Sequence, residues 1–187
     1  MQERYVKDDI ELEWMDNSEK GGGTLYRMLA ECWADYVDEL NRIDNQVEIG
    51  GPLTLPEENL SQRYLMIWKR TGKGLKFAGF IFLSIWPSSF SRHDAYVGEL
   101  YIKPELRKNK IATKAMEICL ESDIGDEKDF TMYILEGNYP ARMFWKQFFE
   151  KRGYTERLTD GNVTATIKGW NNCRFYYYTK EARSGEF

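Results

Sequence analysis

A run of basic residues lies where an apolar, strand-like segment gives way to a helix. It reads Leu106-Arg107-Lys108-Asn109-Lys110-Ile111-Ala112-Thr113, and no acidic residue occurs between Leu106 and Met116. The first turn of a helix leaves backbone N–H groups unpaired and carries partial positive charge, which acidic side chains offset and basic ones oppose. A bound phosphate would resolve that conflict. The run therefore predicts an anion-binding turn over residues 107–113, with an ordinary basic surface turn as the alternative.

Glu99 is the best candidate for a general base. It lies in the apolar segment 96–102, where strand alternation places it on the same face as Val97 and Tyr101. A carboxyl group in apolar surroundings has a raised pKa and can accept a proton from an ammonium group. The alternative is a carboxylate at a strand edge with a structural partner. His93, the only histidine, lies in a polar loop and is a second, weaker candidate base.

Hydrophobic periodicity predicts the elements that must position these residues. A strand with one buried face is expected at 10–14, and a long amphipathic helix at 25–43. A capping box at 54–57 predicts a short second helix. The remaining predicted elements are a hairpin at 64–68 and 77–86, a strand at 96–102, a helix at about 107–122, a strand at 129–135, a helix ending at Gly153, and two or three strands among 154–159, 163–168 and 174–179.

This order, β-α-α-β-β-β-α-β-α-β-β, predicts an α/β fold with a mixed central sheet flanked by helices. The chain has 187 residues, which suits a single domain over residues 1–187. It contains no apolar run long enough for a membrane helix and no signal-peptide pattern at its start, so a cytoplasmic protein is predicted. The net charge of −4 argues against a nucleic-acid partner. Its three cysteines have no metal-site spacing, and no metal is expected.

The strand, the basic turn and the helix resemble the acetyl-CoA-binding core of the GNAT acetyltransferases. That family carries Gln/Arg-x-x-Gly-x-Gly/Ala at this junction, and the chain has Arg107-x-x-Lys110-x-Ala112, with lysine in place of the first glycine. A second match consists of Asn138, Ala141 and the stretch Phe149-Glu150-Lys151-Arg152-Gly153-Tyr154. The helix between them is one turn longer than in the family. The order of elements is similar to the GNAT fold over nearly the whole chain.

The resemblance implies acetyl-CoA as cosubstrate and assigns residues to it. The strand at 96–102 would separate from the strand at 130–135 to admit the cofactor, whose pantetheine arm would pair with backbone groups of Leu100, Tyr101 and Ile102. The pyrophosphate would lie on the turn formed by Arg107, Lys108, Asn109, Lys110, Ile111, Ala112 and Thr113, with Asn138 reaching the cofactor from the following helix. Trp145 and Phe148 are expected in the core.

The resemblance also implies catalytic roles. Glu99 would be the base that receives the amine's proton. Many family members have a tyrosine acid where this chain has Phe149, which cannot donate a proton. Tyr139, Tyr133 or water could replace it, or no acid is needed; Tyr139 is our candidate.

The function implied is acetyl-CoA-dependent N-acetylation of a primary amine. The acceptor would be a cationic small molecule, either aminoglycoside-like or a polyamine, or a protein amino group. Glu31, Asp35, Asp38 and Glu39 share one face of the helix at 25–43 and favour a cationic acceptor. The alternative is a catalytically weak acyl-CoA-binding sensor or interaction module of the same fold. No membrane partner is expected, and a homodimer is left open.

Overall fold

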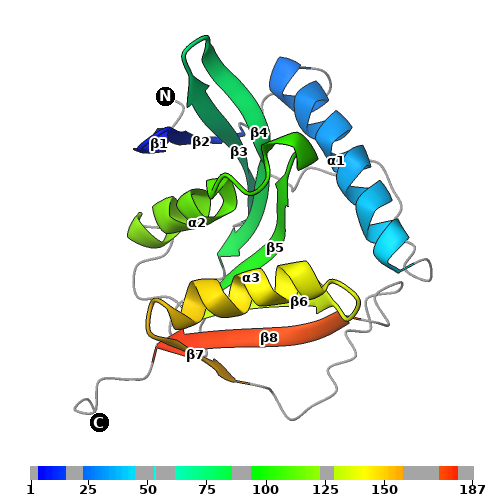
Figure 1. Cartoon of the computed structure of the whole chain (residues 1–187), viewed down its shortest axis with the longest axis vertical. Coiled ribbons are helices and arrows are strands. Elements are labelled where there is room, and N and C mark those ends of the chain that lie inside the picture. Colours follow the sequence, from blue (N-terminus) through cyan, green and yellow to red (C-terminus); the bar gives the residue numbers. More distant parts are fainter. Residues whose placement is uncertain are drawn as a thin grey trace.

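The computed structural model describes residues 4–15, 23–44, 53, 62–85, 94–122, 129–157 and 173–180. These residues form one eight-stranded sheet with the order β1-β2-β3-β4-β5-β6-β8-β7 (Figure 1). The strands are β1 (Arg4–Lys7), β2 (Ile10–Trp14), β3 (Gln62–Thr71), β4 (Gly74–Ile85), β5 (Asp94–Ile102), β6 (Asp129–Leu135), β7 (Tyr154–Arg157) and β8 (Cys173–Lys180). The helices are α1 (Thr24–Ile43), the short 3₁₀ turn η2 (Pro104–Leu106), α2 (Ile111–Glu121) and α3 (Tyr139–Glu150). The predicted mixed α/β sheet is confirmed.

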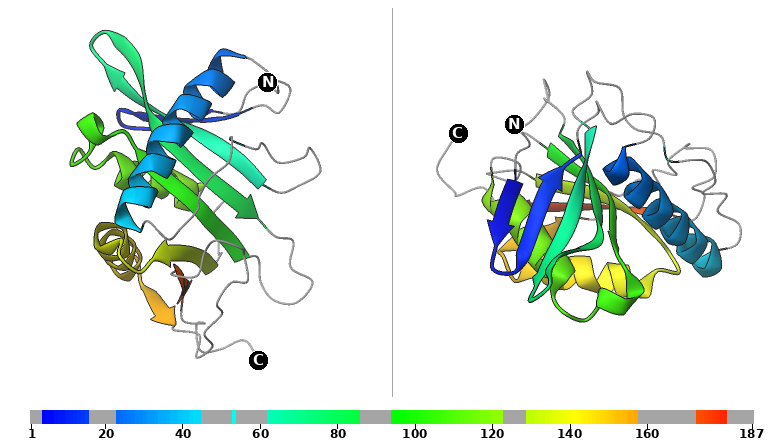
Figure 2. Two further views of the ribbon diagram at one scale, coloured as in Figure 1. Left: turned by 90° about the vertical axis from the view of Figure 1, so that its right-hand side faces the viewer. Right: turned by 90° about the horizontal axis from the view of Figure 1, so that it is seen from above.

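Helices cover both faces of the sheet. On one face, the main core cluster includes Ala115 of α2 together with Trp145 and Phe149 of α3. On the other face, a second cluster includes Leu29 and Cys32 of α1, which the sequence pattern had placed on the apolar side of that helix. Figure 2 shows α1 on the opposite side of the sheet from α2. The apolar stripes of the three helices are thus buried against the sheet from two sides.

The pairing between β5 and β6 is the only parallel pairing in the described sheet, and it is short. It joins Asp94 to Asp129, Ala95 to Phe130 and Tyr96 to Thr131, and no further pair follows. Every other neighbouring pair of described strands is antiparallel. Beyond Tyr96 the two strands therefore diverge, and the edge of β5 that faces β6 is no longer paired with it (Figure 1).

A bulge in β5 begins the divergence. Phe82 of β4 pairs with Glu99, and the next residue, Leu83, pairs with Val97, so Gly98 is an extra residue without a partner on β4. A β-carbon at Gly98 would lie 2.4 Å from the Phe82 ring, which favours glycine here. A bulge re-aims the side chains that follow it.

The bulge changes the face on which Glu99 lies. Val97 belongs to the cluster beneath α2 and α3, whereas Tyr101 belongs to the cluster beneath α1. Because Glu99 contacts α1, it shares a face with Tyr101 only. The prediction that Val97 and Tyr101 flank Glu99 on one face was wrong, since simple alternation does not allow for the extra residue.

Two other predictions need correction. The hairpin partner β1 was not predicted, and β2 is buried on both faces rather than one. Glu11 and Glu13 are each only 4% exposed, because arginine partners cover them. Arg4 donates to Glu13 at 2.7 Å, and Arg70 pairs with Glu11. The predicted helix after residues 54–57, the strand at 163–168 and His93 lie outside the described residues.

None of the helices in the described ranges is both long and apolar enough to cross a lipid bilayer.

The close approach of β4 to β5 at Gly79 generates a stability prediction. A β-carbon there would lie 1.9 Å from the carbonyl oxygen of Tyr101, and the backbone has a positive φ of 155°. We expect Gly79→Ala to lower the free energy of unfolding by about 2 kcal/mol or more, because backbone atoms must move apart. Urea denaturation measures the effect. Gly72→Ala is the control, since a β-carbon at Gly72 meets nothing within 4 Å; equal losses in the two variants would contradict the prediction.

Candidate active site

Two adjoining cavities, together called the fork, lie where β5 diverges from β6: an inner one between the two strands, and an outer one between the end of β5, the start of α2, α1 and α3. The inner one has a volume of about 70 Å³ and lies between the two strands, with Glu99 and Tyr133 in its lining. The outer one has a volume of about 440 Å³ and extends to the turn before α2. The side chains shared by both linings are Tyr36, Leu40, Leu100, Asn138, Ala141 and Trp145. The fork is thus a continuous space that runs from the basic turn to Glu99.

Glu99 has the electrostatic properties expected of a base. Burial raises the pKa of its carboxyl group to about 7, and a hydrogen bond from the Tyr36 hydroxyl partly opposes that rise. At neutral pH the group is therefore divided between its two protonation states, so it can accept a proton and release it again. Its side chain is half-buried because one side borders the inner cavity.

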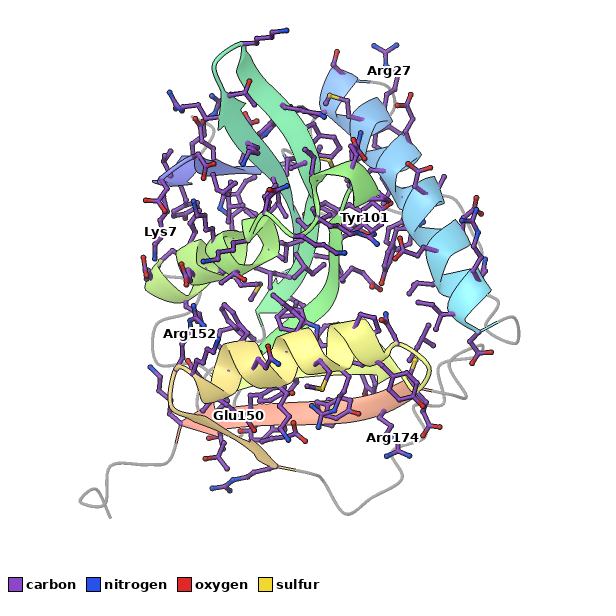
Figure 3. All side chains as sticks on the ribbon, in the orientation of Figure 1. Lys7, Arg27, Tyr101, Glu150, Arg152 and Arg174 are labelled. Carbon is purple, nitrogen blue, oxygen red and sulfur yellow. The ribbon has the colours of Figure 1, made fainter. Side chains whose placement is uncertain are left out.

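Tyr36 is a site residue that sequence reasoning missed. It projects from α1, and its ring packs on Phe80 and Tyr101 with centroid distances of 5.8 and 5.5 Å. Figure 3 shows Tyr101 in the space between β5 and α1. In the sequence, Tyr36 was only one more member of an apolar helical stripe. Its hydroxyl group on that stripe was the available signal, because a buried phenol needs a hydrogen-bond partner.

The basic turn over residues 107–113 precedes α2, which begins at Ile111 and not at about 107. Lys110 precedes the helix in the left-handed conformation with φ 57°, no side chain caps the helix, and its first turn holds no acid. The N–H of Lys114 is bonded to the carbonyl of Lys110 at 2.9 Å, so the N–H groups of Ile111, Ala112 and Thr113 precede the intrahelical bonds. These three residues line the outer cavity.

The left-handed backbone at Lys110 is a conformation that glycine adopts more easily than lysine does. The GNAT motif has a glycine there, and glycine adopts positive φ without the steric cost that a β-carbon brings. Lys108 also has a positive φ, of 62°. Both lysines have exposed side chains that line the outer cavity. The chain therefore keeps the backbone of the glycine turn while adding positive charge to it.

Arg107 is bonded within the protein. Its Nε donates to the carbonyl of Ile102 at 2.8 Å, and its two terminal nitrogens donate to the carboxylate of Glu39 at 2.8 and 2.6 Å. The guanidinium also lies over the Tyr101 ring, 5.3 Å from its centroid. The bonds to Glu39 raise the arginine's pKa, so it stays charged. In this arrangement Arg107 links α1 to the end of β5 at the rim of the outer cavity.

Of the other residues expected to bind the cofactor, four line a cavity and Asn109 does not. Leu100, Tyr101 and Ile102 line the outer cavity, and Asn138 lines both. The Asn138 side chain also caps α3 by accepting from the N–H of Ala141 at 3.2 Å. Asn109 lines neither cavity; its amide donates to the carbonyls of Leu106 and Arg107 and shapes the turn.

Residues near α3 fall into three different places. Trp145, expected in the core, is 6% exposed and lines both cavities as well. Phe149 is fully buried and stacks on Tyr178 with a centroid distance of 4.4 Å, so it borders neither cavity. Tyr139 is 73% exposed and lines neither cavity. The structure therefore does not bring Tyr139 together with Glu99.

The acidic face of α1 is divided. Glu31, Asp35 and Asp38 are not part of either cavity lining, whereas Glu39 lines the outer cavity and is bonded to Arg107. A cationic acceptor in the fork would therefore not meet the other three acids.

A family model described as the acetyltransferase (GNAT) family matches residues 24–154. Similar solved structures include Arabidopsis thaliana Naa50 in complex with the bisubstrate analogue CoA-Ac-MVNAL, with 11% identity over 92% of this chain and 99% of that chain and a TM-score of 0.53. An acetyltransferase from Thermus thermophilus has 12% identity over 91% and 96% of the two chains and a TM-score of 0.56. A GCN5-related N-acetyltransferase from Brucella melitensis has 12% identity over 95% and 78%, also with a TM-score of 0.56. At such identities the likeness to these structures concerns the fold alone. A search of curated protein sequences found no significant match.

The conformation of Lys110 generates a prediction that requires no ligand. A residue with a β-carbon pays about 1 kcal/mol in the left-handed region, and glycine does not. We expect Lys110→Gly to be more stable than Lys110→Ala by about that amount, with both variants lacking the charge. Urea denaturation of the pair measures the difference; an alanine variant as stable as the glycine variant would mean that the turn has another conformation.

Proposed function

The chain belongs to the GNAT family of acetyltransferases, and from this premise we propose that it transfers the acetyl group of acetyl-CoA to a primary amine with Glu99 as general base. The observation that carries the proposal is the position of Glu99. A carboxyl group with a pKa raised to about 7 borders a cavity that continues to an uncapped helix N-terminus. The two adjoining cavities would thus connect Glu99, as proton acceptor, with the start of α2, as anion site.

The donor would occupy the outer cavity. Its phosphates would accept hydrogen bonds from the N–H groups of Ile111, Ala112 and Thr113, with the helix dipole and the lysines at 108 and 110 adding positive potential. The pantetheine arm would lie along the edge of β5 at Leu100–Ile102, where pairing with β6 has ended. Backbone N–H groups there would stabilise the oxyanion that develops on the thioester carbonyl. Asn138 lies at the junction of the two cavities, within reach of the arm.

The acceptor amine would reach Glu99 as an ammonium ion. Glu99 takes one proton from it, and the neutral nitrogen attacks the thioester carbon. The new C–N bond forms, the C–S bond breaks, and the nitrogen's second proton goes to the sulfur of the departing coenzyme A. Tyr36 lines both cavities and donates to Glu99, so we assign it to give its hydroxyl proton to the sulfur and to recover a proton from protonated Glu99, which then accepts the nitrogen's second proton. Tyr139 is left out of the proposal because its side chain faces solvent.

A binding module without catalysis is the second candidate. The observation that favours it is the position of two residues considered for the acid, since Phe149 is in the core and Tyr139 is exposed, which leaves Tyr133 at the inner cavity as the remaining tyrosine named from the sequence. Such a module would bind acetyl-CoA and acetylate no amine. Release of coenzyme A thiol over a panel of amines separates the two proposals. A single domain over residues 1–187 and a cytoplasmic location also stay proposals.

Replacement of the base generates the first prediction of this mechanism. We expect Glu99→Gln to lower kcat by a factor of about 100 to 10,000 while the affinity for acetyl-CoA changes little. In the parent protein kcat/KM should rise with pH through about 7, because Glu99 acts only when it has lost its proton. A Glu99→Gln variant with the parent's turnover between pH 6 and 9 would remove Glu99 from the mechanism.

Tyr36→Phe provides an independent check on the same group. The Tyr36 hydrogen bond lowers the pKa of Glu99, so its loss should raise that pKa and move the acidic limb of the profile to higher pH. If Tyr36 had only a structural role, Tyr36→Phe would lower the maximum of kcat/KM and leave the midpoint of its pH dependence unchanged.

The anion site generates a separate prediction. We expect Lys108→Ala combined with Lys110→Ala to weaken acetyl-CoA binding, with each lost charge-assisted phosphate contact costing about 1.5–3 kcal/mol. Calorimetry at matched salt measures the affinity. Lys73→Ala is the control, because Lys73 is an exposed residue in the turn between β3 and β4. Unchanged affinity in the double variant would place the phosphates elsewhere.

A further inference from the structure

Aromatic side chains gather around Glu99 on the α1 face of the sheet. The Tyr96 and Tyr133 rings meet edge to face at 5.9 Å, and the Tyr133 ring lies 5.0 Å from that of Phe175. On the other side of Glu99, the Phe82 ring lies 4.8 Å from that of Tyr64. We call this set of five rings, Tyr64, Phe82, Tyr96, Tyr133 and Phe175, the aromatic wall. It takes one ring from each of β3, β4, β5, β6 and β8.

The negative charge of Glu99 reaches the wall. Burial first, and then the Glu99 carboxylate, raise the pKa of both Tyr64 and Tyr96. Phe82 pairs directly with Glu99 across β4 and β5, and Tyr133 lines the inner cavity beside it. The carboxylate is therefore bordered by rings on both sides of β5.

Much of this wall is not core. Tyr96, Tyr133 and Phe175 are half-buried, and none of the three buried clusters in the described part of the chain includes them. The main core lies on the opposite face, under α2 and α3. Tyr133 lines the inner cavity, and Tyr96 and Phe175 extend from it through their ring contacts.

Few charged groups line the cavities, although Asp44 at the end of α1 lies near enough to β8 to raise, after burial and Glu99, the pKa of the Cys173 thiol. Glu99 is the only carboxylate among the described residues that line the inner cavity. Glu39, in the outer cavity, is bonded to Arg107, and Asp129 accepts from the Tyr177 hydroxyl at 2.5 Å. Within the inner cavity, a second ammonium group on an acceptor would find no second carboxylate.

We propose that the aromatic wall is the acceptor subsite, and that it selects a small primary amine with one positive charge beside an aromatic or alkyl body. The inference rests on the proposed function, which brings the amine to Glu99. The ammonium group lies at Glu99 and over the adjacent ring faces, where cation–π attraction adds to the ion pair. The apolar body lies on Tyr96, Tyr133 and Phe175, whose half-buried rings offer contact area at little conformational cost.

This proposal replaces the polycationic acceptor expected from the acidic face of α1. Of the four acids on that face only Glu39 lines a cavity, and it is bonded to Arg107, whereas Glu99 is the carboxylate in the lining of the inner cavity. The acceptor is recognised by rings and one carboxylate, and each additional charge lowers its affinity.

A panel of amines tests the selectivity. Initial rates are measured with 2-phenylethylamine, butylamine, spermidine and a short peptide with an N-terminal phenylalanine, all at saturating acetyl-CoA. We expect kcat/KM for 2-phenylethylamine to exceed that for spermidine by about tenfold or more, because its phenyl ring packs on the wall and it brings no additional charge that needs a partner. Equal values, or a preference for spermidine, would overturn the proposal. A preference for the peptide over both small apolar amines would assign the wall to a protein N-terminus and overturn the small-molecule assignment.

Substitutions in the wall test whether the rings are responsible. We expect Tyr133→Leu and Tyr96→Leu each to raise the KM for 2-phenylethylamine about tenfold, with the KM for acetyl-CoA unchanged. Tyr133→Phe keeps the ring and should keep the parent KM. The control is Tyr26→Leu, which removes another half-buried tyrosine at the first turn of α1. If the leucine and phenylalanine variants at position 133 give the same amine KM, the ring does not bind the acceptor.

Calorimetry separates this inference from the proposed function. 2-Phenylethylamine is titrated into protein saturated with coenzyme A, both parent and Tyr133→Leu. Binding that the leucine variant weakens, without acetylation of any amine, would support the subsite and overturn the proposed activity. Turnover with other amines but no binding of 2-phenylethylamine would do the reverse. Neither binding nor turnover would overturn both.

Discussion

The early end of the parallel pairing between β5 and β6 is the constraint on which the whole site depends. Three residue pairs hold the two strands together, and then the bulge at Gly98 turns β5 away. Had the pairing continued, its hydrogen bonds would have closed the edge of β5 and side chains would have filled the fork. The divergence instead leaves a space that reaches from the uncapped start of α2 to Glu99. The cavities are therefore a consequence of how the strands pair in the sheet.

The charges of the site are arranged by burial and by neighbours. Glu99 is held among rings with one hydroxyl partner, which keeps its pKa near neutrality, whereas Glu39 is held by a guanidinium at the rim of the cavity. Glu99 accepts a hydrogen bond from Tyr36 of α1, and Glu39 is itself a residue of α1, yet the two carboxyl groups have different chemistry. Desolvation makes the first a proton acceptor, and the ion pair makes the second a structural link.

Local sequence patterns predicted much of this arrangement. The strand at 96–102, the acid-free turn after it and the start of a helix beyond Asn138 all follow from spacing and residue type, and the structure contains each of them. Lys110 was identified as a departure from glycine, but its backbone conformation could not be read from a lysine. The GNAT resemblance supplied the divergence of the two strands, which no periodicity in the sequence contains.

The features that were missed depend on contacts between distant parts of the chain. Arg107 and Glu39 are separated by 68 positions, and Tyr36 and Glu99 by 63. No local pattern specifies such partners. The bulge at Gly98 has no signature in the residue types of the strand, but it interrupts the alternation, so Val97 and Glu99 lie on opposite faces of the sheet. Strand β1 is four residues long and alternates exposed with half-buried positions, which gives too weak a pattern to identify.

Helix α1 carries both Tyr36 and Glu39, three positions apart and therefore on one side of the helix. One of them holds the carboxyl group at the inner end of the fork, and the other holds the arginine at its outer rim. A helix of 20 residues is a stiff rod about 30 Å long. The partner of Arg107 and the phenol that contacts Glu99 are therefore held by one turn of the same rod. The geometry of that turn fixes the spacing between the two ends of the fork.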